Sequence, residues 1–164
     1  MRMQSVDRFL LAIVGGAVVL VIIAVVVVFT RAAPAYRTGN EPGDVAFNYI
    51  LAVQRGDYER AYSYLSPTLP GYPRSVADLR EQLSRVQSYD SDTSYEVIKT
   101  EISGDRAIVT VRETIAYRGG LFSSSQSSNT FTIELTQTDA GWQLTSGSNW
   151  RLWMWCWEQK EGCP

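Results

Sequence analysis

Hydrophobic residues are distributed unevenly along the chain, and the longest apolar run lies near its start. Between Phe9 and Phe29 no side chain is charged or strongly polar. A helix rises about 1.5 Å per residue, so this run reaches across the roughly 30 Å hydrocarbon core of a bilayer. We therefore predict a transmembrane helix over residues 9–29. A cleaved signal peptide is the alternative because Arg2 and Arg8 precede the run, but signal peptides have apolar regions of only about 7–15 residues.

The residues that flank this run bear on its orientation. Arg2 and Arg8 precede it and Arg31 and Arg37 follow it, so the positive-inside rule alone decides little. We expect the common layout of a signal anchor, in which the leading segment stays in the cytoplasm and the rest is exported. The predicted parts are a cytoplasmic segment, a single pass through a bacterial inner membrane, a linker with Pro and Gly, and a periplasmic or extracellular domain: residues 1–8, 9–29, 30–43 and 44–164.

Apolar positions after the linker recur at helical spacing in three places. The first predicted helix runs from Asp44 to Arg55 and ends at Gly56, which favours a C-cap. The second is capped by Asp57 and ends before Pro67. The third begins at a capping box formed by Ser75 to Asp78. Its predicted apolar face consists of Val76, Leu79, Leu83 and Val86.

The hydrophobic period then changes from 3.6 to 2, which is typical of strands. Tyr95 to Ile102 and Ala107 to Tyr117 are predicted to pair as a hairpin around a glycine turn. Thr130 to Thr136 alternates cleanly, and a fourth strand begins at Trp142. The serine-rich stretch from Gly119 to Asn129 is predicted to be a flexible exposed loop, with a partner-binding loop as the alternative. The pattern predicts an α+β domain with three helices and four antiparallel strands.

The helical part also resembles a known family. The stretch from Ala46 to Pro67, AFNYILAVQRGDYERAYSYLSP, is similar to the opening helices of small bacterial, membrane-anchored members of the NTF2-like superfamily. The shared features are Gly-Asp-Tyr at 56–58, Ala-Tyr at 61–62 and Leu-Ser at 65–66, and Gly-Trp at 141–142 resembles the turn into the last strands. The resemblance implies a cone, with the helices packed on a curved four-stranded sheet. It also implies a cavity at the open end in some members and dimers through the sheet in others. No single chemistry follows, because this fold hosts isomerases, dehydratases, transport factors and structural domains.

Composition argues against several classes of partner and cofactor. The formal net charge of −2 gives no basic surface for nucleic acid, so no nucleic-acid partner is expected. The chain has two cysteines and no histidine, so we expect no metal and no cofactor. Cys156 and Cys163 are seven positions apart, and we expect them to form a disulfide in an oxidising compartment, with free thiols as the alternative.

A single carboxylate is a weak candidate for catalysis. Glu113 shares its predicted strand face with apolar neighbours, and the hydroxyl groups of Tyr49, Tyr95 and Tyr117 are available to a cone cavity. A glutamate near a strand end is more often solvated or paired with an arginine. Without a histidine or a second acid, no catalytic constellation is apparent. We therefore expect that the protein is not an enzyme.

Two features indicate docking. If the tail Asn149 to Trp157 is extended, Trp153, Trp155 and Trp157 share one face and Trp150 lies on the other. Both faces are apolar, so the tail is expected to cover the domain's own sheet, to contact membrane lipid, or to bind another protein. In the predicted span, a second helix could approach closely at three small residues, Ala12, Gly15 and Gly16.

These features favour a non-catalytic, single-span accessory or assembly subunit of a larger bacterial membrane complex. The candidates are electron-transfer complexes and the scaffolds of secretion and conjugation machines. The sequence does not distinguish between these two kinds of complex. The alternative from another class is a membrane-tethered module that binds a small hydrophobic ligand or acts as an isomerase- or dehydratase-like enzyme. A homodimer through the sheet is a further possibility.

Overall fold

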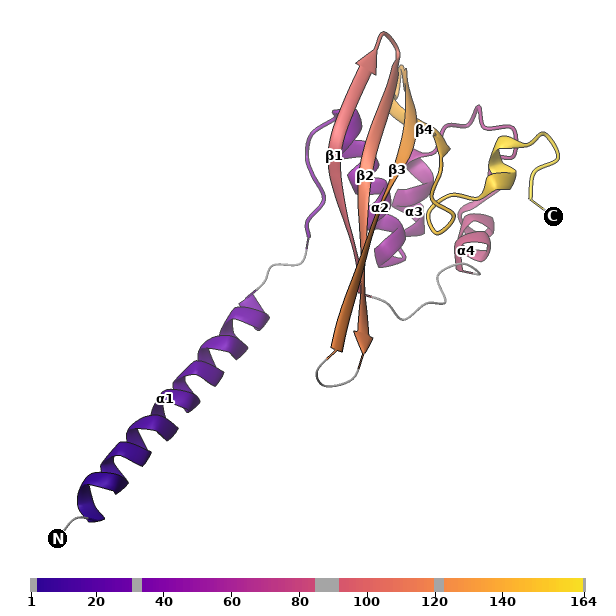
Figure 1. The fold of residues 1–164 in the computed structure, drawn as a ribbon. Helices are drawn as coiled ribbons and strands as arrows, with labels where there is room; N and C mark the ends of the chain where they lie inside the picture. The colour runs from indigo at the N-terminus through magenta and orange to yellow at the C-terminus, as the bar shows by residue number, and fades with distance from the viewer. Residues whose placement is uncertain (1–2, 31–33, 85–91, 120–122, 164) are drawn as a thin grey trace. The chain divides into compact units, whose positions relative to one another are not determined.

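The computed structural model describes residues 3–30, 34–84, 92–119 and 123–163 (Figure 1). The chain forms two compact units, residues 1–35 and residues 36–164, which are considered separately below. In the first unit, α1 (Met3–Thr30) is a continuous helix. Its segment Phe9–Val26 is long and apolar enough to cross a membrane, and all of these residues are exposed. The prediction of one apolar helix of membrane-spanning length is thus confirmed, while its topology stays a prediction.

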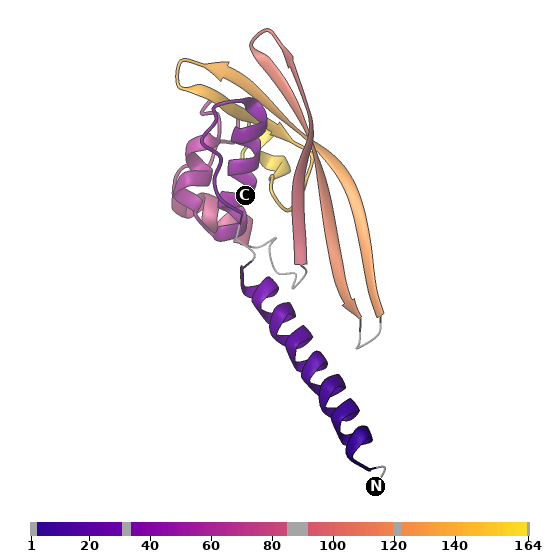
Figure 2. The same cartoon turned by 90° about the vertical axis from the view of Figure 1, so that its left-hand side faces the viewer.

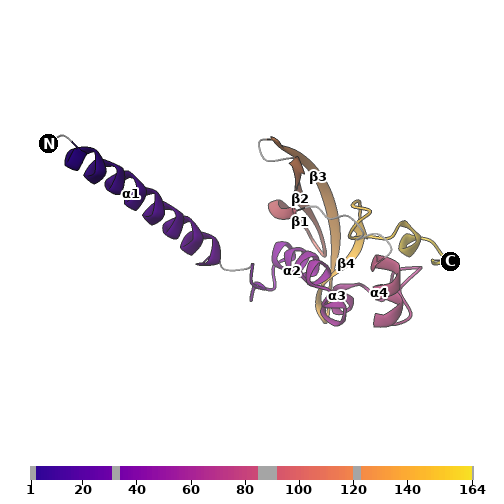
Figure 3. The ribbon, with the colours of Figure 1, turned by 90° about the horizontal axis from the view of Figure 1, so that it is seen from below.

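The second unit is an α+β domain. Its helices are α2 (Pro42–Arg55), α3 (Tyr58–Tyr64) and α4 (Val76–Ser84), and its strands are β1 (Asp92–Ser103), β2 (Arg106–Gly119), β3 (Ser123–Thr138) and β4 (Gly141–Gly147), followed by the short 3₁₀ helix η1 (Trp155–Glu158). The strands form one antiparallel sheet in the order β1-β2-β3-β4. The sheet is curved and the helices lie on one side of it (Figures 2 and 3). The predicted fold, helices packed on a curved four-stranded antiparallel sheet, is confirmed.

Local signals position the helices as the sequence indicates. Gly56 ends α2 with φ +68°, a left-handed conformation that glycine adopts without strain. The Asp57 side chain accepts a hydrogen bond from the Arg60 backbone N–H and so caps α3. The Ser75 hydroxyl accepts from the Asp78 N–H at the start of α4, at 3.2 Å. Val86, which was expected on the apolar face of α4, lies outside the described residues.

The core lies between the helices and the inner face of the sheet. Alternate residues of β2 are buried, as period-2 patterning requires, and α2 packs against them with its apolar face. Tyr49, Ile50 and Val53 of α2 are each at most 1 % exposed. The central buried residues of the sheet are Ala107, Val109, Val111, Ile133, Leu135 and Leu144.

Two boundaries differ from expectation. The serine-rich stretch is not a loop where it is described: β3 begins at Ser123, which pairs with Gly119 of β2. Backbone ladder bonds do not depend on side-chain polarity, and β2 supplies a continuous partner strand with which the serine-rich segment pairs. Residues 120–122 lie outside the described part.

The linker is also shorter than expected, because the segment from Tyr36 onward is bound to the domain. The backbone N–H of Arg37 donates to the Asn48 side chain at 2.8 Å, and the Asn48 amide donates back to the Arg37 carbonyl at 2.9 Å. The Tyr36 hydroxyl donates to the Asp57 carboxylate at 3.0 Å. This segment therefore belongs to the second unit.

Candidate functional site

The tail, residues 148–163, follows β4 and folds back over the domain instead of continuing as a strand (Figure 1). The carbonyl of Asn149 accepts hydrogen bonds from the backbone N–H groups of Leu152 and Trp153, at 3.0 and 2.8 Å. This turn and the following η1 replace the extended conformation. The two-faced arrangement expected for an extended tail is therefore wrong, because alternate residues no longer point to opposite sides.

One pair of tryptophans anchors the tail. Trp153 and Trp157 are 4 % and 0 % exposed, and their rings meet edge to face with centroids 4.9 Å apart. The indole N–H of Trp157 donates to the Gln82 side chain of α4 at 2.6 Å. The indole N–H of Trp153 donates to Glu158 Oε1 at 2.9 Å. Both buried indoles thus have the hydrogen-bond partner that burial requires.

Close backbone approach makes this packing possible at two glycines. A Cβ at Gly147 would lie 2.9 Å from the Trp153 ring, so the ring packs flat against bare backbone. The N–H of Gly71 donates to the Trp157 carbonyl at 2.9 Å, and a Cβ at Gly71 would lie 3.0 Å from the Trp157 Cα. Cys156 of η1 and Cys163 beyond it form a disulfide with a Cα–Cα distance of 4.9 Å. The tail is thereby held at several separate points.

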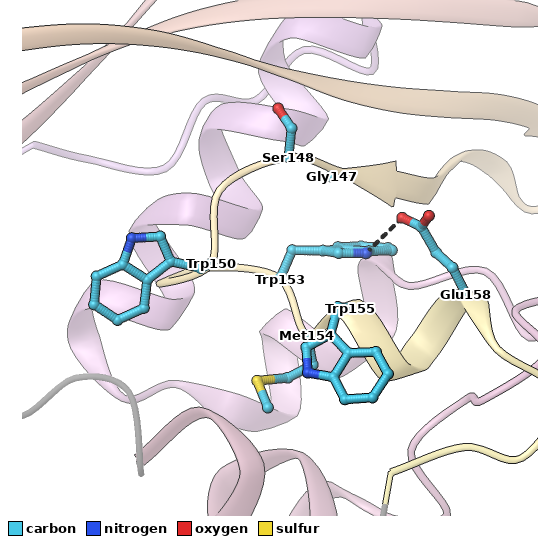
Figure 4. A pocket seen from close by; sticks show the side chains of 7 residues that line it. All are labelled: Gly147, Ser148, Trp150, Trp153, Met154, Trp155 and Glu158. Atoms are coloured by element: carbon cyan, nitrogen blue, oxygen red, sulfur yellow. Dashed lines mark hydrogen bonds between the residues drawn. The ribbon is translucent and has the colours of Figure 1, made fainter.

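The other pair of tryptophans faces outward. Trp150 and Trp155 are 57 % and 65 % exposed. They border a hollow of about 440 Å³, which we call the tryptophan groove (Figure 4). Its lining consists of Gly147, Ser148, Trp150, Trp153, Met154, Trp155 and Glu158.

A second hollow adjoins the tryptophan groove and shares two residues with it. It has a volume of about 310 Å³, and Met154 and Trp155 line both hollows. Its other lining residues come from α4, the segment before it and the disulfide: Arg74, Asp78, Glu81, Gln82, Cys156 and Cys163. Trp155 therefore stands between two depressions, as an exposed anchor side chain would at a binding surface.

Glu113, the weak catalytic candidate, lies where β2 meets the tail and is 7 % exposed. Its Oε1 accepts from the Tyr95 hydroxyl at 3.1 Å and from the Asn149 amide at 3.3 Å. Arg151 lies 3.8 Å from the same oxygen. Burial, and secondly the Glu113 charge, raise the pKa of Tyr95 above its ordinary value of 10.0, so this hydroxyl keeps its proton and remains a donor. The carboxylate thus joins β1, β2 and the tail.

The remaining candidates lie apart from Glu113. The Tyr49 hydroxyl donates to the Leu152 carbonyl, and Tyr117 is 49 % exposed, so of these tyrosines Tyr95 is the one that contacts the carboxylate. On α1, a Cβ at Gly15 or Gly16 would meet nothing within 4 Å, and Ala12 is exposed. The helix contact proposed for this face stays a prediction. Among the described residues, no three Cys, Asp or Glu side chains converge as metal ligands would.

The sequence patterns indicate the tryptophans of the groove but miss three of its other lining residues, Gly147, Ser148 and Glu158. Met154 lies within the aromatic run, on the face that an extended tail would share with Trp150, and Glu158 directly follows the run. An acidic residue directly after Trp157 was the available signal for Glu158. Its role depends on η1, which returns its side chain to Trp153.

No family model and no curated protein sequence matches this chain. Solved structures similar to it include a SEC-C motif containing protein from Rhodopseudomonas palustris, at 15 % identity and a TM-score of 0.49, covering 68 % of this chain and 80 % of that one. An NTF-2 like protein of unknown function from Shewanella oneidensis matches at 12 % identity and a TM-score of 0.44, with 63 % and 90 % covered. A provisionally assigned dehydratase of the NTF2-like family from Streptomyces avermitilis matches at 19 % and 0.46, with 64 % and 90 % covered.

These similarities concern the fold alone. Element order and sheet topology, three helices followed by one antiparallel sheet in the order β1-β2-β3-β4, agree with what the resemblance in residues 46–67 implies. The chain therefore combines this α+β domain with an N-terminal apolar helix of membrane-spanning length.

Proposed function

We propose that this protein is a non-catalytic, single-span accessory subunit of a larger bacterial membrane complex, and that its exported domain docks through the tryptophan groove. The observation that carries the proposal is the division of the tail into two pairs of tryptophans. Trp153 and Trp157 are buried and fix the tail, whereas Trp150 and Trp155 are held in the open. Large exposed aromatic side chains on a fixed support are typical of binding anchors.

Because the tail is already fixed, it loses less conformational entropy when a partner binds. The disulfide, the packing at Gly71 and the hydrogen bond from Trp157 to Gln82 each restrict it. An ordered Trp loses little further freedom on association, so its contact area contributes more fully to affinity. The disulfide also fits an exported, oxidising location, in agreement with a cytoplasmic leading segment and a membrane span over α1.

Glu113 supports a structural role better than a catalytic one. A general base must reach a substrate proton, and Glu113 is only 7 % exposed. Here the Tyr95 hydroxyl, the Asn149 amide and the Arg151 guanidinium all approach the same oxygen, Oε1. These contacts connect the sheet with the tail, so the carboxylate contributes to holding the tail in place.

The test is co-purification of the full chain from membranes of its native host in mild detergent, with bound proteins quantified by mass spectrometry. A Trp150→Ala/Trp155→Ala variant should lose the associated membrane subunits. Each anchor of this kind contributes about 2 kcal/mol or more, which corresponds to roughly thirtyfold in affinity per residue. The matched control is Ile102→Ala/Tyr117→Ala, which removes two apolar side chains of similar exposure, 53 % and 49 %, elsewhere on the domain.

The control variant should retain its partners at the wild-type ratio. Equal recovery of the same subunits with both variants would show that docking does not involve the groove. Purification of the wild type as a free monomer would remove the accessory-subunit role altogether.

A further inference from the structure

The tryptophan groove has a chemical preference that its shape alone does not reveal. Three indole side chains and the thioether of Met154 line it, and Glu158 is the one charged residue among the lining residues. The face of an indole carries negative potential, which attracts cations. A carboxylate at the end of an aromatic groove adds a full negative charge to the negative potential of the indole faces.

Glu158 is held in place at the edge of the groove. Its Oε1 accepts from the Trp153 indole N–H and from the Ser146 hydroxyl, both at 2.9 Å. Within the described part of the chain, no hydrogen bond or ion pair engages its second oxygen, Oε2. In Figure 4 the carboxylate lies beyond the Trp153 ring, with its contact to the indole drawn as a dashed line. The charge is thus positioned by neutral donors, and no cation among the described residues forms an ion pair with it.

The charged side chains around the groove also bear on its preference for cations. Asp78 and Glu81 line the adjoining hollow, where Arg74 lies 3.8 Å from Asp78. The other nearby cation, Arg151, is already occupied by Glu113, 3.8 Å away. Its guanidinium carbon also lies 5.1 Å from the centre of the Trp150 ring, so one face of this indole already holds a cation of the chain itself. Glu158 is thus the charge that the lining of the groove itself contributes.

We propose that the tryptophan groove binds a basic side chain, lysine or arginine, of the partner protein. This inference rests on the proposed docking function and names the chemistry of the partner. The alkyl part of such a side chain lies along the indole rings and Met154, while its cationic head lies toward Glu158. Charge complementarity selects this occupant over a neutral apolar one.

The test uses the full chain, labelled with 5-fluorotryptophan, in uncharged maltoside detergent at constant ionic strength. Fluorine resonances are assigned by single Trp→Phe variants. The probes are n-butylammonium for lysine, n-propylguanidinium for arginine, and 1-butanol as a neutral compound of equal length. We expect the resonances of Trp150 and Trp155 to shift saturably with the cations, at midpoints at least fivefold below that of the alcohol. The buried Trp157 is the internal reference.

Glu158→Gln is the decisive variant. Its amide oxygen still accepts from Trp153 and Ser146, so the groove keeps its shape while the charge is lost. We expect cation midpoints to rise about three- to fivefold, the effect of one exposed ion pair, with no change for the alcohol. Glu134→Gln, an exposed carboxylate on the sheet, should change nothing. Equal shifts for cations and alcohol, or wild-type midpoints in Glu158→Gln, would overturn the proposal.

Two further outcomes separate this inference from the docking function. If co-purification depends on Trp150 and Trp155 but cations show no preference, docking stands and the basic side chain is wrong. If cations bind as expected but co-purification ignores both tryptophans, the groove is a cation site that does not serve docking. Choline binding more than tenfold tighter than n-butylammonium would indicate a trimethylammonium lipid headgroup and contradict a protein side chain.

Discussion

Replacing Trp157 by alanine is expected to weaken the whole domain, although Trp157 lies only seven positions from the last residue. Its side chain is 0 % exposed, it contacts Trp153 edge to face, and its N–H bonds Gln82. Truncation of a buried Trp removes apolar contact and leaves a cavity, which typically costs about 3–5 kcal/mol. The Gln82 amide oxygen is also left without its partner, which adds about 1 kcal/mol.

The matched control is Trp155→Ala, two positions away and 65 % exposed. An exposed substitution of this kind usually changes the free energy of unfolding by about 0.5 kcal/mol or less. Trp157→Phe separates the two contributions, because it keeps most of the ring contact and loses the hydrogen bond. We expect Trp157→Ala to be the least stable, Trp157→Phe intermediate and Trp155→Ala close to wild type.

The assay is urea unfolding of the full chain in mild detergent, followed by near-ultraviolet circular dichroism, which reports the packing of aromatic side chains. A midpoint shift at constant slope gives the difference in free energy. If Trp157→Ala and Trp155→Ala unfold within about 1 kcal/mol of each other, the division into anchoring and exposed tryptophans is refuted.

The remaining predictions concern the supports of the tail and its pH dependence. Reduction of the bond between Cys156 and Cys163, or its removal in a double serine variant, should cost about 2.5 kcal/mol by the chain-entropy estimate for so short a loop; an unchanged urea midpoint with dithiothreitol would contradict this. Gly147→Ala places a methyl group 2.9 Å from the Trp153 ring and should cost about 1–3 kcal/mol in the same assay. An unchanged urea midpoint would contradict this and show that the ring moves freely. Burial raises the pKa of Tyr49 above its ordinary value of 10.0, so the unfolded chain ionises first. The Tyr49 contribution to stability is therefore complete below pH 10 and is lost as the pH rises above it. Tyr49→Phe should lower the stability by about 1 kcal/mol near neutral pH and make its alkaline decline less steep, which pH-dependent urea titrations would detect.

Most of the fold could be predicted from local patterns, because its elements carry their own signals. The length of α1, the glycine end of α2 and the alternation in β2 are each readable from neighbouring residues. The serine-rich start of β3 was not, since its strand conformation comes from pairing with β2 and not from its own side chains. Pairing between strands is a property of the assembled sheet.

The candidate site was predictable in composition but not in arrangement. The tryptophans were visible in the sequence, yet their division into buried and exposed pairs depends on distant contacts. Trp157 reaches Gln82, 75 positions earlier, and packs beside Gly71. The turn at Asn149 ends the alternation that an extended tail would have. Such contacts exist only after folding, so the periodicity of the tail could not reveal them.

The most direct test of the central claim is site-specific photo-crosslinking in intact membranes of the native host. A photoreactive phenylalanine analogue replaces Trp155 at the groove or Tyr117 at a similarly exposed position on β2. The account predicts a discrete cross-linked product with a membrane-complex subunit from position 155, weakened by Trp150→Ala, and none from position 117. Identical products from both positions, or none from position 155 in membranes that contain the assembled complex, would contradict it.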